Sequence, residues 1–175
     1  IFLAFGTLFA QNDLQPLATI KLNKTESVTL KQLKARCEVY KKQTGLTSFT
    51  VDQKKEILDS LIDEKLILQA AAKAGLNFTD SQVQEIYLKS LASQIGASQI
   101  TEQQFATIVK EQTGLSLDDF FIAQLAMTAT EYKTFLKNQA LAQQYVILQK
   151  EEEIASVVAT DAEIREYYDM NQASF

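Results

Sequence analysis

The chain has no histidine and no tryptophan, and it has only one cysteine and one proline among its 175 residues. The absence of histidine excludes Cys/His zinc sites and histidine-based catalytic triads, and it removes the side chain most often used as a general acid or base. The sequence also contains no phosphate-binding loop and no dinucleotide fingerprint. We therefore predict no catalytic residue, no cofactor and no metal site in this chain.

Carboxylates remain as candidates for acid–base chemistry, and two adjacent pairs stand out. Asp63-Glu64 and Asp118-Asp119 each lie on an expected helix, where neighbouring side chains point to different faces. Neither pair is therefore expected to share a proton on its own. We interpret both pairs as solvated or helix-capping acids, and the run Glu151 to Glu153 as a solvated helix surface.

The charge distribution gives a further exclusion. Seventeen basic and twenty-two acidic residues leave a net charge of −5, and neither sign forms a long block. A surface that neutralises the phosphates of a nucleic acid is therefore not expected.

The single cysteine, Cys37, cannot form a disulfide within the chain. It lies between Arg36 and Val39 on an expected helix, and free cysteine commonly behaves as a small buried hydrophobe. We favour that interpretation; a reactive or intermolecular thiol is the alternative.

The first ten residues are uncharged and mostly apolar, and the polar segment 11–13 follows them. This pattern is typical of the end of a signal peptide, and Ala10 is an acceptable small residue before a cleavage point. We therefore interpret residues 1–10 as a signal-peptide remnant; an apolar strand or helix that packs on the core is the alternative. The stretch is too short to span a bilayer, so we expect no stable membrane span after its removal.

Sparse glycine and proline, together with abundant Leu, Ala, Gln, Lys and Glu, favour helices. Strand-like alternation over 17–22 and the short segment 27–29 predict a small N-terminal β-hairpin. We predict a mainly all-α fold in which six to seven helices follow this hairpin. The expected helices cover residues 30–44, 51–74, 79–95, 101–113, 117–127, 130–153 and 161–172.

Regular signals mark where these helices start. Six threonines each precede a Glu or Gln by three residues, which is the spacing of a capping box. They are Thr29, Thr50, Thr79, Thr101, Thr128 and Thr160. Ser116, which is followed by two aspartates in the next turn, predicts a seventh start.

Glycines mark where helices end. Gly45, Gly75 and Gly114 each precede a leucine, as in the Schellman motif, and Gly96 closes a fourth helix. The tetrapeptide Gln-Thr-Gly-Leu occurs twice, at 43–46 and 112–115. Because the flanking residues differ, we interpret it as the same helix stop used twice and not as an internal repeat.

Adjacent aromatic residues are candidates for a binding surface. Phe120-Phe121 and Tyr167-Tyr168 lie on expected helices, and two neighbours cannot both face one narrow core stripe. Packing in a wide apolar core is the favoured interpretation, and a surface for an extended or unfolded polypeptide client is the functional alternative. The candidate client-binding residues, which gather around the fifth and sixth helices, are Phe120, Phe121, Tyr132, Phe135 and Tyr145.

Three stretches of the chain resemble the N-terminal chaperone module of SurA- and PrsA-like extracytoplasmic folding factors. They are the hairpin that leads through Val28-Thr29-Leu30 into a helix, the long apolar helix and glycine stop of 57–76 followed by Thr79-Asp80, and the segment 160–169. The last stretch is similar to the helix that leads from this module into a parvulin-type prolyl isomerase domain. No catalytic signature takes part in the resemblance.

The resemblance implies a periplasmic or otherwise extracytoplasmic chaperone domain that binds unfolded exported or outer-membrane proteins through apolar surfaces. It assigns residues 11–159 to the chaperone domain and residues 160–175 to a helix leading toward a parvulin domain. Isomerase activity would belong to that further domain, so this chain is expected not to be an enzyme. Some members complete the module with a distant C-terminal helix, and its absence here implies an apolar groove that is either open or filled by a partner chain. A homodimer formed through this groove is therefore a further hypothesis.

Two other functions stay open at this point. One is a non-catalytic accessory part of a parvulin-type peptidyl-prolyl isomerase. The other is a helical protein that docks one fixed partner.

Overall fold

A computed structural model describes residues 13–172 of the chain, except for the side chain of residue 152. The predicted signal-peptide remnant, residues 1–10, lies outside the described residues. The prediction of a mainly all-α fold with an N-terminal hairpin is confirmed. The elements are β1 (Pro16–Lys21), β2 (Thr25–Thr29), α2 (Leu30–Thr44), α3 (Val51–Lys73), α4 (Asp80–Gln94), α5 (Glu102–Thr113), α6 (Leu117–Leu125), α7 (Ala129–Gln149), α8 (Glu151–Ser156) and α9 (Asp161–Asn171).

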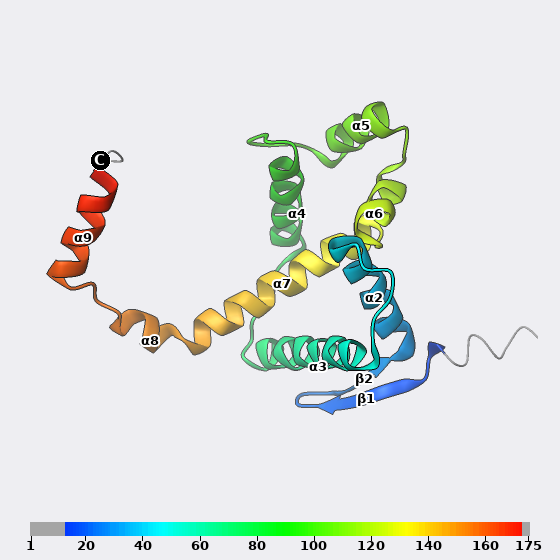
Figure 1. The fold of residues 1–175 in the computed structure, drawn as a ribbon, viewed down its shortest axis with the longest axis horizontal. Coiled ribbons are helices and arrows are strands. Elements are labelled where there is room, and N and C mark those ends of the chain that lie inside the picture. The colour runs from blue at the N-terminus through cyan, green and yellow to red at the C-terminus, as the bar shows by residue number, and fades with distance from the viewer. Residues whose placement is uncertain (1–12, 173–175) are drawn as a thin grey trace, which may run out of the picture. The chain divides into compact units, whose positions relative to one another are not determined.

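The chain divides into two compact units, with the boundary between Tyr145 and Val146. The first unit holds the hairpin, α2 to α6 and most of α7, and the second holds the end of α7 with α8 and α9 (Figure 1). The charge is divided unevenly between them. Residues 1–145 carry fifteen basic and fifteen acidic residues, whereas residues 146–175 carry two basic and seven acidic ones. The whole net charge of −5 therefore belongs to the second unit.

The two strands form an antiparallel hairpin that lies along α3 (Figure 1). Ala18 pairs with Val28 and Ile20 pairs with Glu26. Because side chains alternate along a strand, the apolar members of these pairs reach the same face, where Ile20 and Val28 form a buried cluster with Leu61 of α3. This cluster anchors the hairpin on the helix.

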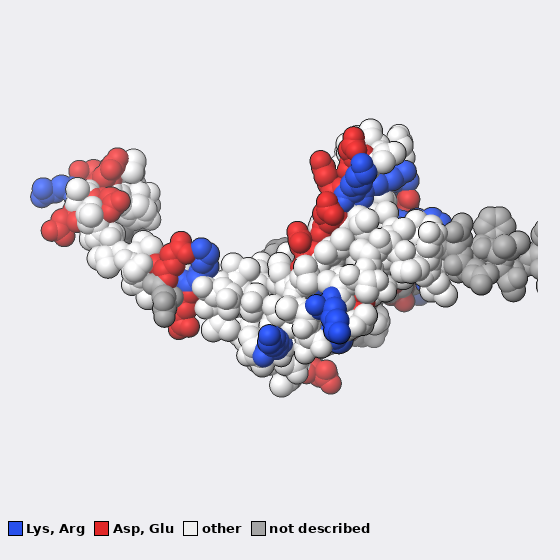
Figure 2. All heavy atoms as spheres, turned by 90° about the horizontal axis from the view of Figure 1, so that it is seen from below, with Lys and Arg blue, Asp and Glu red and all other residues white. Residues whose placement is uncertain are grey.

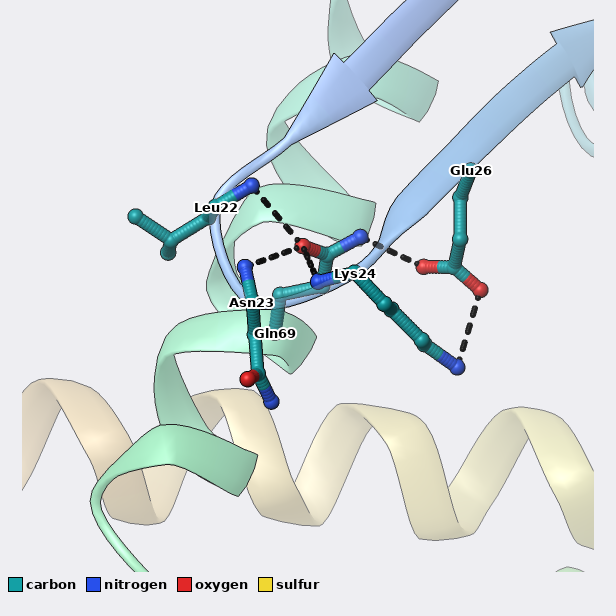
Figure 3. A network of polar contacts seen from close by, with 5 residues as sticks. All are labelled: Leu22, Asn23, Lys24, Glu26 and Gln69. Atoms are coloured by element: carbon teal, nitrogen blue, oxygen red, sulfur yellow. Dashed lines mark hydrogen bonds and ion pairs between the residues drawn. The ribbon is translucent and has the colours of Figure 1, made fainter.

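One buried side chain of α3, Gln69, holds the turn between the strands (Figure 3). Its Oε1 accepts hydrogen bonds from the backbone N–H groups of Leu22, Asn23 and Lys24, at 3.1, 2.9 and 3.3 Å. Its Nε2 donates to Glu26 Oε2 at 2.8 Å, and Lys24 Nζ pairs with Glu26 Oε1 at 3.1 Å. The buried amide thus has partners for both its oxygen and its nitrogen, as a polar group inside a protein requires.

All seven predicted helix starts are confirmed. Each of the six threonine hydroxyls accepts a hydrogen bond from the backbone N–H three residues later, and the Glu or Gln there accepts one from the threonine N–H. Ser116 accepts from the N–H of Asp119 at 3.1 Å. Asp118 accepts from the N–H of Ala129 at 2.8 Å, at the start of α7. Asp118 therefore caps α7, in agreement with the capping interpretation, whereas the Asp119 carboxylate accepts a hydrogen bond from the Ser116 hydroxyl at 2.6 Å.

The Gly75 stop has the predicted Schellman bonding, with Leu76 N–H donating to the carbonyl of Ala71 at 3.0 Å and Gly75 N–H donating to Ala72 at 3.1 Å. Its φ of 78° is the left-handed conformation that glycine adopts readily.

For the two Gln-Thr-Gly-Leu segments the Schellman prediction is wrong. The leucine N–H donates to the preceding threonine hydroxyl instead, at 3.3 Å for Thr44 and 3.2 Å for Thr113. Each hydroxyl in turn donates to the carbonyl four residues earlier, at 2.7 Å. The interpretation as one helix stop used twice is confirmed, because both copies make the same pair of bonds.

A second core cluster joins α4, α5, α6 and the start of α7. Its buried members are Tyr87, Leu91, Phe105, Val109, Phe121 and Ala129. The hydroxyl of Tyr87 lies 3.5 Å from the Glu102 carboxylate. Burial is the main cause that raises the pKa of this phenol, and the nearby carboxylate raises it further. Tyr87 therefore stays neutral and serves as a packing residue.

The expected single helix over 130–153 is wrong, because α7 ends at Gln149 and α8 begins at Glu151. Lys150 interrupts the helical geometry with φ −106° and ψ 7°. Acidic residues are unfavourable at the negative C-terminal end of a helix and favourable at the positive N-terminal end. The break places Glu151 and Glu153 in the first turn of a new helix, so residues 13–172 contain eight helices where seven were expected. The other helix bounds agree with the prediction to within two residues.

Candidate functional site

Two adjoining grooves lie in the first unit, and both are lined by α3 and α7. The first, which we call the apolar groove, has a volume of about 570 Å³ and also involves α2 and the α6–α7 turn. Its main apolar lining residues are Ala35, Val39, Leu61, Leu68, Met127 and Phe135.

An ion pair between α2 and α3 lies in the apolar groove. Arg36 Nη2 is 2.5 Å from Glu64 Oε2, and the two side chains are only 20% and 32% exposed. A charge that is removed from water in this way is costly unless it is paired. The pairing therefore lets these two half-buried charges line the groove alongside Lys65 and Glu131, while most of its wall is apolar.

The second groove, which we call the acidic groove, lies between α3 and α7 and has a volume of about 590 Å³. Four carboxylates of α3 line it, whereas no lysine or arginine does. They are Glu56, Asp59, Asp63 and Glu64. Asp63 is exposed, as expected for a solvated acid. For Glu64 the interpretation as a solvated or capping acid is wrong, because it is 32% exposed and pairs with Arg36. Both residues line the acidic groove, and Glu64 also lines the apolar groove.

Phe135 of α7 lines both grooves and stands at the end of a series of aromatic rings. Ring centroids are 6.3 Å apart for Phe105 and Phe121, 4.8 Å for Phe121 and Tyr132, and 6.4 Å for Tyr132 and Phe135. The Tyr132 hydroxyl is fixed by Ser90, 2.6 Å away. The rings thus connect the second core cluster with the groove surface.

The structure separates the five aromatic candidates by exposure. Phe121 is fully buried, Phe120, Tyr132 and Tyr145 are half-buried, and Phe135 is 37% exposed. Only Phe135 among them lines either groove. Phe121 has no surface to offer to another molecule in this conformation, so any binding role for it is indirect.

Core packing of Phe120-Phe121, the favoured interpretation, is confirmed. Phe105 of α5 contacts both rings, with centroids 6.2 Å from Phe120 and 6.3 Å from Phe121, and Tyr132 of α7 stacks on Phe121. Both neighbouring rings of α6 are packed because Phe105 of α5 contacts each of them, and Tyr132 of α7 adds a second contact to Phe121. For Tyr167-Tyr168, in the second unit, the core-packing interpretation is wrong, because the two side chains are 60% and 52% exposed.

The buried interpretation of Cys37 is also confirmed, since its exposure is 8%. Burial raises the pKa of its thiol, which disfavours the reactive thiolate.

The described part of the chain shows neither of two other kinds of site. Within residues 13–172 no group of acidic and cysteine side chains is arranged to hold a metal ion. None of the helices in that range is both long enough and apolar enough to cross a membrane. On the face drawn in Figure 2, charged side chains form small groups separated by uncharged surface, and no large basic patch is visible.

These features define a mainly helical domain whose open grooves, and not an enclosed pocket, are the candidate site. The chain is similar to the protein named foldase protein PrsA of Clostridium acetobutylicum, with 26% identity over 162 residues. The alignment covers 92% of this chain but 43% of that protein, so the chain spans less than half the length of the relative. No family model matches the chain, and no solved structure matches it significantly.

Proposed function

We propose that this chain is an extracytoplasmic chaperone domain that binds unfolded exported or outer-membrane polypeptides in the apolar groove. The observation that carries the proposal is an open groove with an exposed aromatic ring, Phe135, on its wall. Unfolded chains differ from folded ones in the apolar side chains that they expose, and open apolar grooves suit extended or helical segments of many sequences. The similarity to a protein named as a foldase supports the same role.

Within this proposal the aromatic candidates have different parts. Phe135 contacts the client. Tyr132 stacks on the Phe135 ring from the core side and so holds that ring in position. Phe120 and Phe121 stabilise the second core cluster on which that stacking depends. A direct contact at Tyr145 stays a prediction, since Tyr145 lies outside both grooves.

The test is light scattering of an outer-membrane-type protein diluted from denaturant, with and without this chain at near-stoichiometric ratio. We expect the chain to suppress aggregation and Phe135→Ser to weaken the suppression severalfold. Ile122→Ser is the matched control, because Ile122 is an exposed apolar residue of α6 outside both grooves. No suppression by the unaltered chain would overturn the proposal, and a single tight partner in a pull-down would favour a docking protein instead.

A second candidate function is suggested by the length of the relative. That protein is named as a foldase, and the alignment with this chain covers only 43% of it. Under this second function, residues 11–159 form the chaperone domain, and residues 160–175 lead toward a parvulin domain that carries the catalysis. The chain would then be a non-catalytic accessory part of a prolyl isomerase. A peptide isomerisation assay tests this role: the chain by itself is expected to give no acceleration, and a measurable rate enhancement would contradict it.

A further inference from the structure

We propose that the grooves select client segments in which a lysine or arginine lies beside apolar side chains. This inference rests on the proposed chaperone function and specifies its substrate class. The two grooves share Glu64, Phe135 and Asn138 in their linings, so one bound segment can extend from the apolar groove across Phe135 into the acidic groove.

The charge of the acidic groove argues for a cationic partner. Glu56, Asp59 and Asp63 are separated by three and four residues, so they form one stripe along α3. Like charges at this spacing repel one another within a helix. Among the described residues no ion pair joins any of these three carboxylates to a basic side chain, whereas Glu64 is neutralised by Arg36. A cation bound in this groove would relieve that repulsion.

The opposite wall argues for a side chain that is both cationic and apolar. Phe135 and Ala142 of α7 line this groove opposite the carboxylates, and Ile67 adds an apolar side chain on α3 itself. Lysine and arginine have an apolar stem and a charged head, so the stem can lie on this wall while the head reaches the carboxylates. A cation that lies over the Phe135 ring would gain a further favourable interaction. A metal ion fits less well, because the described acidic side chains do not form a metal-binding group.

The adjoining apolar groove then explains why the cation must have apolar neighbours. When the apolar residues of a segment occupy that groove, its basic residue is already held near the α3 carboxylates. Binding of the charge then costs little further conformational entropy of the segment. A wholly apolar segment uses one groove only, and an acidic residue at the same position is repelled. The preference is therefore expected to depend on salt, whereas the apolar contribution is not.

The experiment compares three labelled peptides with the same apolar sequence and arginine, citrulline or glutamate at one flanking position. Citrulline keeps the size of arginine without its charge. Binding to the full chain is measured by fluorescence anisotropy at low and high salt. We expect arginine to bind about three- to tenfold more tightly than citrulline at low salt, in line with a few partly exposed ion pairs. The order of affinities should be arginine, citrulline, glutamate.

A charge-removing variant assigns the preference to the acidic groove. The triple variant Glu56→Gln, Asp59→Asn, Asp63→Asn should bind all three peptides with the affinity of the citrulline peptide, and loss of repulsion within α3 should keep it folded. The matched control Glu38→Gln, Glu85→Gln, Glu111→Gln removes three exposed charges outside both grooves. It should retain the preference for arginine.

The outcomes separate this inference from the proposed function. Equal affinities for arginine and citrulline peptides, with aggregation still suppressed, would overturn the charge preference alone. Failure to bind any peptide, together with failure to suppress aggregation, would overturn the chaperone function as well. A molar mass that falls from dimer to monomer in the triple variant would show that a second copy of the chain occupies the acidic groove, which would also overturn the inference.

Discussion

The Gln69 amide donates a hydrogen bond to the Glu26 carboxylate at 2.8 Å, although the two residues are 43 positions apart in the chain. The same amide accepts from three consecutive backbone N–H groups of the hairpin turn. This network attaches the hairpin to α3 by polar contacts at one end (Figure 3), while Ile20, Val28 and Leu61 attach it by apolar contacts.

Replacing Gln69 with leucine should destabilise the protein by about 1–3 kcal/mol. The change removes the acceptor of three turn amides and the donor to Glu26, but water can replace part of these bonds near the surface. Urea denaturation followed by circular dichroism measures the loss. Gln124→Leu, at an exposed position of α6, is the control and should change stability by no more than about 0.5 kcal/mol. Equal effects of the two changes would contradict the role of Gln69.

The Glu26 carboxylate should make stability depend on pH in the acidic range. The hydrogen bond from Gln69, with a smaller effect of Lys24, lowers the pKa of Glu26 although burial partly opposes this. Because the folded pKa lies below the unfolded value of about 4.3, the ionised group stabilises the protein above that pH. This contribution is lost as the pH falls through the folded pKa.

Glu26→Gln therefore should be less stable than the unaltered protein at pH 7, and the difference should shrink toward pH 3. Urea midpoints at several pH values measure it. A difference that stays constant over the whole range would show that the charge of Glu26 does not contribute.

Two phenylalanines of the aromatic series should differ in their effect on stability. Phe121 is fully buried, so Phe121→Ala should cost about 3–5 kcal/mol through lost burial and the cavity left behind. Phe135 is 37% exposed, and Phe135→Ala should cost about 1 kcal/mol while it weakens client binding. Denaturation and aggregation assays on both variants check this. Similar stability losses would show that the Phe135 ring is more deeply packed than the structure indicates.

Loss of the threonine hydroxyl should lower stability more at one copy of the helix stop than at the other. Replacing threonine with valine keeps the shape of the side chain and removes both hydroxyl bonds. The bond of Thr113 to Val109 is partly buried, whereas that of Thr44 to Tyr40 is exposed. Thr113→Val should therefore cost about 1 kcal/mol, and Thr44→Val about 0.5 kcal/mol, in thermal or urea unfolding. The reverse order would contradict this account.

Ala126, at the end of α6, should be improved by glycine. Its φ of 57° and ψ of 33° lie in the left-handed region, which is unfavourable for a residue with a Cβ atom. Ala126→Gly should raise stability by about 0.5–1 kcal/mol, because relief of this strain exceeds the added entropy of the unfolded chain. Ala123→Gly, in the helical part of α6, should lower stability by about the same amount. If both substitutions change stability in the same direction, the account of strain at Ala126 is refuted.

The helix starts, the tetrapeptide stops and the hairpin were predictable because each depends on residues that are close in sequence. A capping box joins two residues three apart, and each threonine stop joins residues within six positions. The break at Lys150 was missed, although the acidic run after it was a local signal against continuing the helix. Local hydrogen bonds and charges therefore indicate where these elements begin and end without knowledge of the tertiary structure.

The sequence predicted that aromatic residues form the candidate site, but not which of the individual rings do so. Phe121 and Phe135 are both aromatic residues on helices, and no local pattern distinguishes the buried ring from the exposed one. Arg36 and Glu64 are 28 positions apart, and neither has a neighbour in sequence that indicates their pairing. The sequence alone therefore determined where most helices begin and end, since backbone capping is local. The tertiary structure decided which rings form the core, and it placed four α3 carboxylates and Phe135 around adjoining grooves, because burial and pairing depend on which helices become neighbours.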